Sequence, residues 1–167
     1  MSRAFVKESD ASAASEALPE RPLADHPNYV TPAGLAQLRA RLHALTAARE
    51  RLKAASDADP LAHGHRLEAE RDARYVAAQI DRAVVVDPAE QPKDEVRFGA
   101  TATLCDEAGR THTFAIVGDD EADVAAGRIS WATPLAKLLI GLKRGDTAVW
   151  QRPDGALEIE VTDIRYA

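Results

Sequence analysis

The chain has 167 residues, of which 46% are hydrophobic and 29% charged, as is usual for a globular protein of one or two domains. Its net charge of −6 argues against broad binding to duplex nucleic acid, which requires a basic surface. No segment approaches the roughly twenty apolar residues of a membrane span, and the N-terminal sequence lacks a hydrophobic signal core. We therefore expect a cytoplasmic protein without a membrane partner.

Residues 1–28 are small and charged, and prolines interrupt them, so we expect a mobile N-terminal arm. A helix is predicted to begin next, with Thr31 as its N-cap and Pro32 at its first position. The leucines that follow recur at the spacing of a coiled-coil seam: Leu35, Leu38, Leu42, Leu45 and Leu52.

The helical pattern breaks at residues 56–60, and we expect a second helix from about Arg66. Its apolar seam uses small residues, namely Ala69, Ala73, Val76, Ile80 and Ala83. Because only a short turn joins the two arms, they must run antiparallel. The sequence thus predicts an antiparallel coiled-coil hairpin over residues 29–86 and a linker over residues 87–95.

The predicted tip of the hairpin carries two carboxylates, Asp57 and Asp59. Carboxylates are ligands that Mg²⁺ prefers, but an aspartate in a turn also commonly caps local backbone N–H groups. Both interpretations stay open. His63 and His65 flank Gly64, and without a third ligand nearby we expect exposed turn histidines rather than a metal pair.

The C-terminal half is rich in β-branched residues and turn signals, which predicts an α+β domain over residues 96–167 with one main helix. That helix should begin with Thr133 as its N-cap and Pro134 at its first position. Cys105 lies in a strand-like run and is expected to be a small buried thiol. The expected strands are Val96–Leu104, Thr111–Val117, Ile129–Trp131, Thr147–Gln151 and Leu157–Ile164.

Three further features of the sequence have more than one interpretation. The acidic residues Asp119, Asp120, Glu121 and Asp123 form either a solvated loop or a loop that contacts a partner. The basic residues of the first helix either face RNA or an acidic channel, or only flank the helix in solvent. We expect the large aromatics to pack in the core or on the surface rather than to wall a pocket: Phe98, Phe114, Trp131 and Trp150.

Several ordered motifs carry a resemblance to a known family. These are Ile-Val-Gly-Asp-Asp-Glu-Ala-Asp at 116–123, Gly-Arg-Ile-Ser at 127–130, Thr-Pro-Leu-Ala-Lys-Leu-Leu-Ile-Gly at 133–141 and Gly-Asp at 145–146. From about Val96 to Tyr166 the chain resembles the C-terminal domain of the bacterial Gre transcript-cleavage factors. The resemblance implies an FKBP-like fold for this domain.

The resemblance also implies a function, that of a transcription elongation regulator which is not an enzyme by itself. Its C-terminal domain would bind core RNA polymerase at the secondary channel through Ser130, Thr133 and Pro134. The hairpin would enter the channel, near the nascent RNA. Separately, a hairpin whose arms pack on each other predicts a monomer, and the heptad pattern leaves a dimer open. Asp57 and Asp59 would then be the catalytic and metal-binding candidates, stimulating cleavage of backtracked RNA through a Mg²⁺ shared with the polymerase. No tightly bound cofactor is implied.

An alternative stays open because the tip lacks the string Gly-Asp-x-Ser-Glu-Asn-Ala-Glu-Tyr of cleavage-active members. The chain would then occupy the channel without catalysis and compete with cleavage factors or other effectors. A third interpretation is a coiled-coil interaction module unrelated to polymerase.

Overall fold

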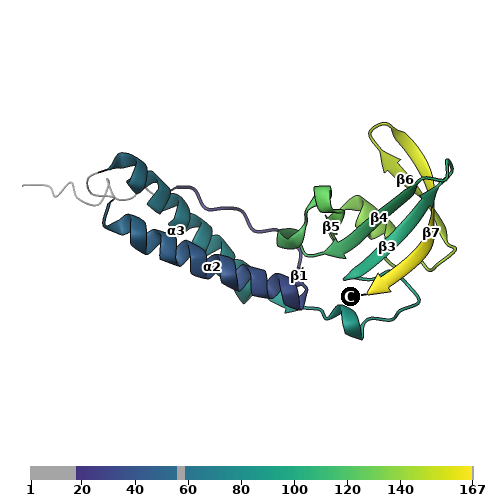
Figure 1. Ribbon diagram of the computed structural model, residues 1–167, viewed down its shortest axis with the longest axis horizontal. Helices are drawn as coiled ribbons and strands as arrows, with labels where there is room; N and C mark the ends of the chain where they lie inside the picture. Colours follow the sequence, from purple (N-terminus) through teal and green to yellow (C-terminus); the bar gives the residue numbers. More distant parts are fainter. Residues whose placement is uncertain (1–17, 56–58, 167) are drawn as a thin grey trace, which may run out of the picture. The chain divides into compact units, whose positions relative to one another are not determined.

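The computed structural model describes residues 18–55 and 59–166 (Figure 1). Its contacts divide the chain into two compact units. Among the described residues, one unit contains residues 18–23 and 39–79, and the other joins residues 24–38 to residues 80–166. The second unit therefore contains the start of the first hairpin helix as well as the whole β-rich domain. The domain boundaries expected from the sequence stay a prediction.

Two helices of equal length form the predicted helical hairpin, α2 (Pro32–Lys53) and α3 (Pro60–Asp81) (Figure 1). The expected start of α2 is confirmed, because the Thr31 hydroxyl accepts a hydrogen bond from the Gly34 N–H at 2.9 Å. The second helix begins at Pro60 rather than near Arg66. Proline at the first helical position loses no intrahelical hydrogen bond, so Pro60 starts α3 instead of breaking it.

The helical seam is less deeply buried than the heptad pattern suggests. Leu38, Ala69 and Val76 are buried, at 4%, 7% and 0% exposure. The other predicted leucines of α2 are half-buried. Gln79 is buried too, and its side-chain amide donates to the Tyr75 hydroxyl at 3.2 Å. A polar residue on this face was not predicted.

Ala83 was expected on the helical seam, but it lies in a short strand. β1 (Asn28–Val30) and β2 (Ala83–Val85) pair in parallel at the two ends of the hairpin, with Tyr29 opposite Val84. The Arg82 guanidinium donates to the carbonyls of Ala24 and His26, each at 2.6 Å. The sequence predicted neither strand, because the two paired segments lie far apart in the chain and no local turn joins them.

The described part of the expected N-terminal arm makes side-chain contacts with α3. Glu20 forms an ion pair with Arg74 at 2.7 Å. The Arg21 guanidinium lies 3.9 Å from the centre of the Tyr75 ring and 3.8 Å from the Asp72 carboxylate. Residues 18–23 therefore belong to the hairpin unit rather than forming a detached arm.

The β-rich domain is a five-stranded sheet in the order β5-β4-β3-β7-β6. Only the β4–β5 pair is parallel; the other neighbours are antiparallel. The first strand starts at Ala100 rather than Val96, because Gly99 adopts a left-handed conformation with φ of 83° just before it. The strands are β3 (Ala100–Asp106), β4 (Thr111–Val117), β5 (Arg128–Ser130), β6 (Thr147–Arg152) and β7 (Gly155–Tyr166).

The core of this domain lies between the sheet and the predicted main helix, α4 (Pro134–Leu139). Buried and half-buried residues alternate along β3, as a strand with one face on a core requires. Leu104, Ile116 and Leu139 are completely buried there. Cys105 faces away from this core and is half-buried, so the expectation of a buried thiol was wrong. The predicted α+β class, with a helical hairpin before a β-rich domain with one main helix, is confirmed.

Candidate functional site

The turn from Ser130 to Pro134 unites the three residues that the sequence assigned to polymerase binding. Thr133 caps α4, because its hydroxyl accepts from the Ala136 N–H at 3.3 Å and donates to the Ser130 carbonyl at 2.7 Å. The backbone N–H of Thr133 also donates to that carbonyl, at 3.0 Å. Pro134 follows at the first helical position and is exposed. The turn is therefore fixed from within and presents its proline to solvent.

The side chains of Asp119 and His26 support the same turn. The Ser130 hydroxyl donates to the Asp119 carboxylate and accepts from the Ala132 N–H at 3.1 Å. The other oxygen of Asp119 lies 3.3 Å from Nε2 of His26. One oxygen of Asp119 thus bonds the serine hydroxyl and the other lies near the histidine, and these contacts position the turn.

The acidic residues before β5 make hydrogen bonds and ion pairs within the domain, and they differ in exposure, because Glu121 is buried whereas Asp123 is exposed. Asp119 and Glu121 belong to the 3-10 helix η2 (Asp119–Glu121), and Glu121 is only 8% exposed. Asp123 caps η3 (Val124–Ala126) through the Ala126 N–H and pairs with Arg128 at 3.3 Å. Spacing alone could not distinguish these capping roles from a partner-contacting loop.

Trp131 is the residue at this site whose role the sequence missed. Its ring centre lies 4.9 Å from that of Tyr29 and 5.1 Å from that of His26, both edge-to-face. Within the described residues its buried indole N–H has no hydrogen-bond partner. The centre of the Tyr29 ring in turn lies 6.1 Å from the centre of the Phe98 ring. The aromatic cluster joins the segment before α2 to the turn that starts α4.

These aromatics also wall a cavity of about 400 Å³, contrary to the expectation from the sequence. Three rings from separate segments contribute, those of Tyr29, Phe98 and Trp131. Phe114 and Trp150 do pack against the domain core, as expected. The cavity could not be foreseen, because Tyr29 is distant in sequence from the β-rich domain. Its remaining lining residues are Val86, Gln91, Arg97 and Ile140.

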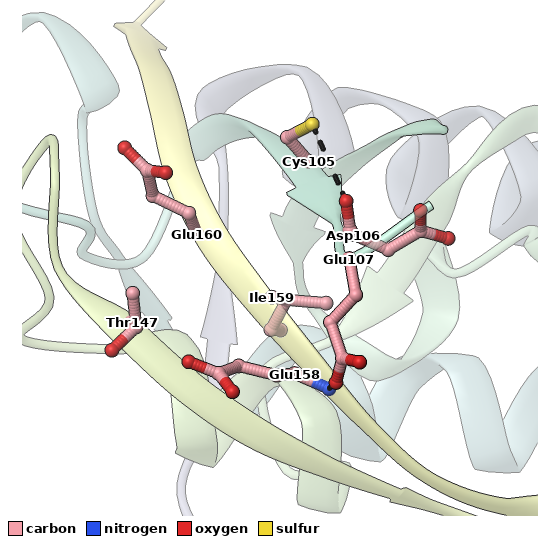
Figure 2. Close-up of a pocket in the computed structure, with 7 residues that line it drawn as sticks. All are labelled: Cys105, Asp106, Glu107, Thr147, Glu158, Ile159 and Glu160. Carbon is pink, nitrogen blue, oxygen red and sulfur yellow. Dashed lines mark hydrogen bonds between the residues drawn. The ribbon is translucent and has the colours of Figure 1, made fainter. Parts of the chain in front are cut away.

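A second, smaller hollow of about 150 Å³ lies beside β3, β6 and β7, away from the proposed contact residues (Figure 2). Glu107, Glu158 and Glu160 give it an acidic lining. The Glu158 N–H donates to the Glu107 carboxylate at 3.3 Å, and the Cys105 thiol donates to the Asp106 carbonyl at 3.6 Å. Across the described ranges no group of three or more His, Cys, Asp or Glu side chains is arranged to hold a metal ion.

Of the two candidate tip carboxylates, only Asp59 can be placed, because Asp57 lies outside the described residues. Asp59 is exposed immediately before α3, and its side chain accepts from the Leu61 N–H at 2.9 Å. This is the capping role that an aspartate has in a helix-starting turn. His63 and His65 lie within α3 rather than in a turn, and His63 is half-buried.

A resident Mg²⁺ ion requires several oxygen ligands in nearly octahedral geometry. Among the described residues, which do not include Asp57, Asp59 belongs to no group of three metal-ligating side chains.

Comparisons with known proteins define the class of protein to which this architecture belongs. The family described as "Transcription elongation factor, GreA/GreB, C-term" matches residues 91–166. Transcription elongation factor GreB of Neisseria meningitidis serogroup B is 38% identical over 154 residues, covering 83% of this chain and 94% of that protein. GreA of Rhodospirillum rubrum is 37% identical over 151 residues, covering 82% and 96%.

Solved structures with detectable similarity include GreA/GreB from Nitrosomonas europaea, with a TM-score of 0.42, 22% identity and coverage of 83% of this chain and 99% of that chain. The chain belongs to the GreA/GreB family of transcription elongation factors. The family predicted from the ordered motifs is thus confirmed, and with it the view that the chain is an accessory factor rather than an enzyme by itself. Within the described residues, no helix is both long and apolar enough to cross a membrane.

Proposed function

We propose that the chain regulates transcription elongation by binding core RNA polymerase at its secondary channel through the β-rich domain, while the hairpin enters the channel. The observation that carries this proposal is the turn at Ser130–Pro134, in which the three assigned contact residues are united. A turn already held by hydrogen bonds loses little conformational entropy on binding, which favours affinity. The names of the relatives, which are transcription elongation factors, support polymerase as the target.

For the action of the hairpin, the capping role of Asp59 favours the non-catalytic alternative. A carboxylate that accepts from the Leu61 N–H in the first turn of α3 already contributes to helix stability. Any Mg²⁺ would have to be shared, with most ligands supplied by the polymerase. We therefore propose a channel occupant that competes with cleavage factors or other effectors, and stimulation of RNA cleavage is the outcome that would replace it.

The two activities can be separated with stalled, backtracked elongation complexes and Mg²⁺. Under the proposal the wild-type chain binds and leaves the RNA length unchanged, and it slows cleavage by an added cleavage factor. Faster shortening that Asp57→Ala and Asp59→Ala together abolish would establish cleavage stimulation instead. Pro134→Ala should weaken binding to core polymerase, with Val149→Ala, at an exposed position on β6, as the control. Absence of wild-type binding would refute the proposal.

The hairpin's basic side chains and its oligomeric state complete the proposal. Arg39, Arg41 and Arg51 are exposed on α2, so they are available to nascent RNA in the complex. Crosslinking from these positions to the RNA 3′ end would test that contact.

Because each arm of the hairpin provides a packing partner for the other, we propose a cytoplasmic monomer. A dimer in sedimentation equilibrium at micromolar concentration would contradict it.

A further inference from the structure

The start of α2 has an unusual capping arrangement. In a capping box, a threonine at the N-cap accepts from the backbone N–H three residues later, and a glutamate at that later position bonds back to the N-cap N–H. Thr31 fulfils the first half, with its hydroxyl 2.9 Å from the Gly34 nitrogen. The position for the glutamate is occupied by Gly34, which has no side chain. The second half of the box must come from elsewhere.

Glu121 supplies it, from a position 90 residues along the chain. The Thr31 N–H donates to Oε2 of Glu121 at 3.0 Å, and the Thr31 hydroxyl donates to the other carboxylate oxygen. The same carboxylate accepts from the Gly118 N–H at 3.2 Å, at the start of η2. One carboxylate thus satisfies the beginnings of two helices, where negative charge is also favoured by the peptide dipoles.

Two glycines make room for this carboxylate. A Cβ at Gly34 would lie 2.1 Å from the carboxyl carbon of Glu121, so any side chain there would displace it. A Cβ at Gly118 would lie 2.4 Å from the Tyr29 carbonyl oxygen and 2.8 Å from the glutamate. Glu121 and Thr31 are 8% and 9% exposed, so water cannot readily replace the lost bonds.

We propose that Glu121 is a positioning residue that completes the capping box of α2 from the β-rich domain and thereby couples hairpin and domain. Thr31, Gly34 and Glu121 all belong to the same compact unit, which also contains the proposed polymerase-contact turn. From this first turn α2 continues as one helix from Pro32 to Lys53. The coupling would be required for the hairpin's effect in the channel, and this part rests on the proposed function.

A pair of variants separates coupling from simple helix capping. Glu121→Ala removes both the capping bond and the link to the domain. Adding Gly34→Glu to Glu121→Ala restores a glutamate at the local capping position while the link stays broken. Glu160→Ala, at an exposed glutamate on β7, is the matched control. Amide hydrogen exchange of the intact chain, measured over residues 28–38 and 117–122, reports the coupling without polymerase.

We expect exchange over both segments to accelerate about 10- to 100-fold in Glu121→Ala, since a hydrogen bond to a buried charged group is lost. The double variant should restore protection over 33–38 but not over 117–122. The control should match the wild type. Unchanged protection in Glu121→Ala, or full recovery of both segments in the double variant, would overturn the coupling. Unchanged exchange over β3 and β7 verifies that the domain remains folded.

The polymerase measurement then tests what the coupling does. Both variants keep the contact residues Ser130, Thr133 and Pro134, but the loosened η2 segment contains Asp119, which supports that turn. The variants are therefore compared at concentrations that saturate their binding to core polymerase, where both should lose most of the effect on an added cleavage factor. Wild-type-like activity of the double variant would show that capping alone matters and would refute positioning. If the wild-type chain itself fails to bind polymerase, the proposed function fails, while the exchange result still decides whether Glu121 couples the two segments.

Discussion

The β-rich domain and the hairpin bury their apolar residues to different extents. In the domain, Leu104, Ile116, Leu139 and Ile159 are at most 1% exposed and form one continuous cluster with their neighbours. In the hairpin, most seam leucines are half-buried, and the buried positions of α3 are mainly small. Buried area is the main source of stability, so the domain should withstand perturbations that unfold the hairpin.

This difference matches the roles that we propose. A surface that docks on a large partner benefits from a rigid domain beneath it. A hairpin of two helices has little core of its own, so its stability depends on contacts at its ends. Local opening should therefore begin in the hairpin, with the domain retaining the highest protection from hydrogen exchange.

The largest effect is expected from Leu139→Ala. This side chain is completely buried between α4 and the sheet, so its removal should lower the free energy of unfolding of the domain by about 3 kcal/mol. Val149→Ala, at 50% exposure, should cost less than about 0.5 kcal/mol. Urea denaturation followed by Trp150 fluorescence measures both. Equal effects would mean that the domain core does not dominate its stability.

A smaller effect, confined to the hairpin, is expected from Val76→Ala. Val76 is 0% exposed, and its truncation should cost about 2 kcal/mol locally, seen as faster hydrogen exchange over residues 60–81 but not over β3. Leu61→Ala in the same helix removes more atoms but from a side chain that is 74% exposed, so it should have almost no effect. Faster exchange in both regions would show that they unfold together.

Thr133→Ala should destabilise the start of α4 by about 1 kcal/mol, because it removes the N-cap hydroxyl. Thr133→Ser keeps the hydroxyl and should retain most of the stability. Thermal denaturation of both variants tests this expectation. The alanine variant should also weaken polymerase binding more than the serine variant does, and the reverse order would separate the cap from the contact.

The smallest effect is expected from mild acid. Hydrogen bonds from His112 and from Arg110 hold the pKa of Asp106 well below its usual range, although its burial acts in the opposite direction. A carboxyl group with a lowered folded-state pKa stabilises the fold above its unfolded value, roughly pH 4, and this contribution is lost as the pH falls further. Between pH 7 and pH 5 its contribution should therefore stay constant.

Denaturation midpoints of the domain at pH 7, 5 and 3 measure this dependence, with Asp106→Asn as the comparison. The wild type should lose stability chiefly below about pH 4, and the variant should lose less over the same interval because the titrating group is absent. Equal losses below pH 4 in the two proteins would assign the acid sensitivity to other carboxylates.

Sequence reasoning was most successful where a local rule applies. Thr-Pro pairs predicted the starts of α2 and α4, and β-branched residues between turn signals predicted β4 with its observed bounds. It failed at Pro60, where the same rule of proline at the first helical position was not applied. The turn at Ser130–Pro134 was predicted as a contact from the family resemblance, but its support by Asp119 was not.

The amino-acid sequence by itself determined the family, the two kinds of architecture and the starts of α2 and α4, because these depend on residues close together in the chain. Only the tertiary structure decided that β1 pairs with β2, that Tyr29 meets Phe98 and Trp131, and that Glu121 caps α2. Each of these contacts joins segments far apart in sequence. Their distances and burial arise from how the chain packs, and no local periodicity encodes them.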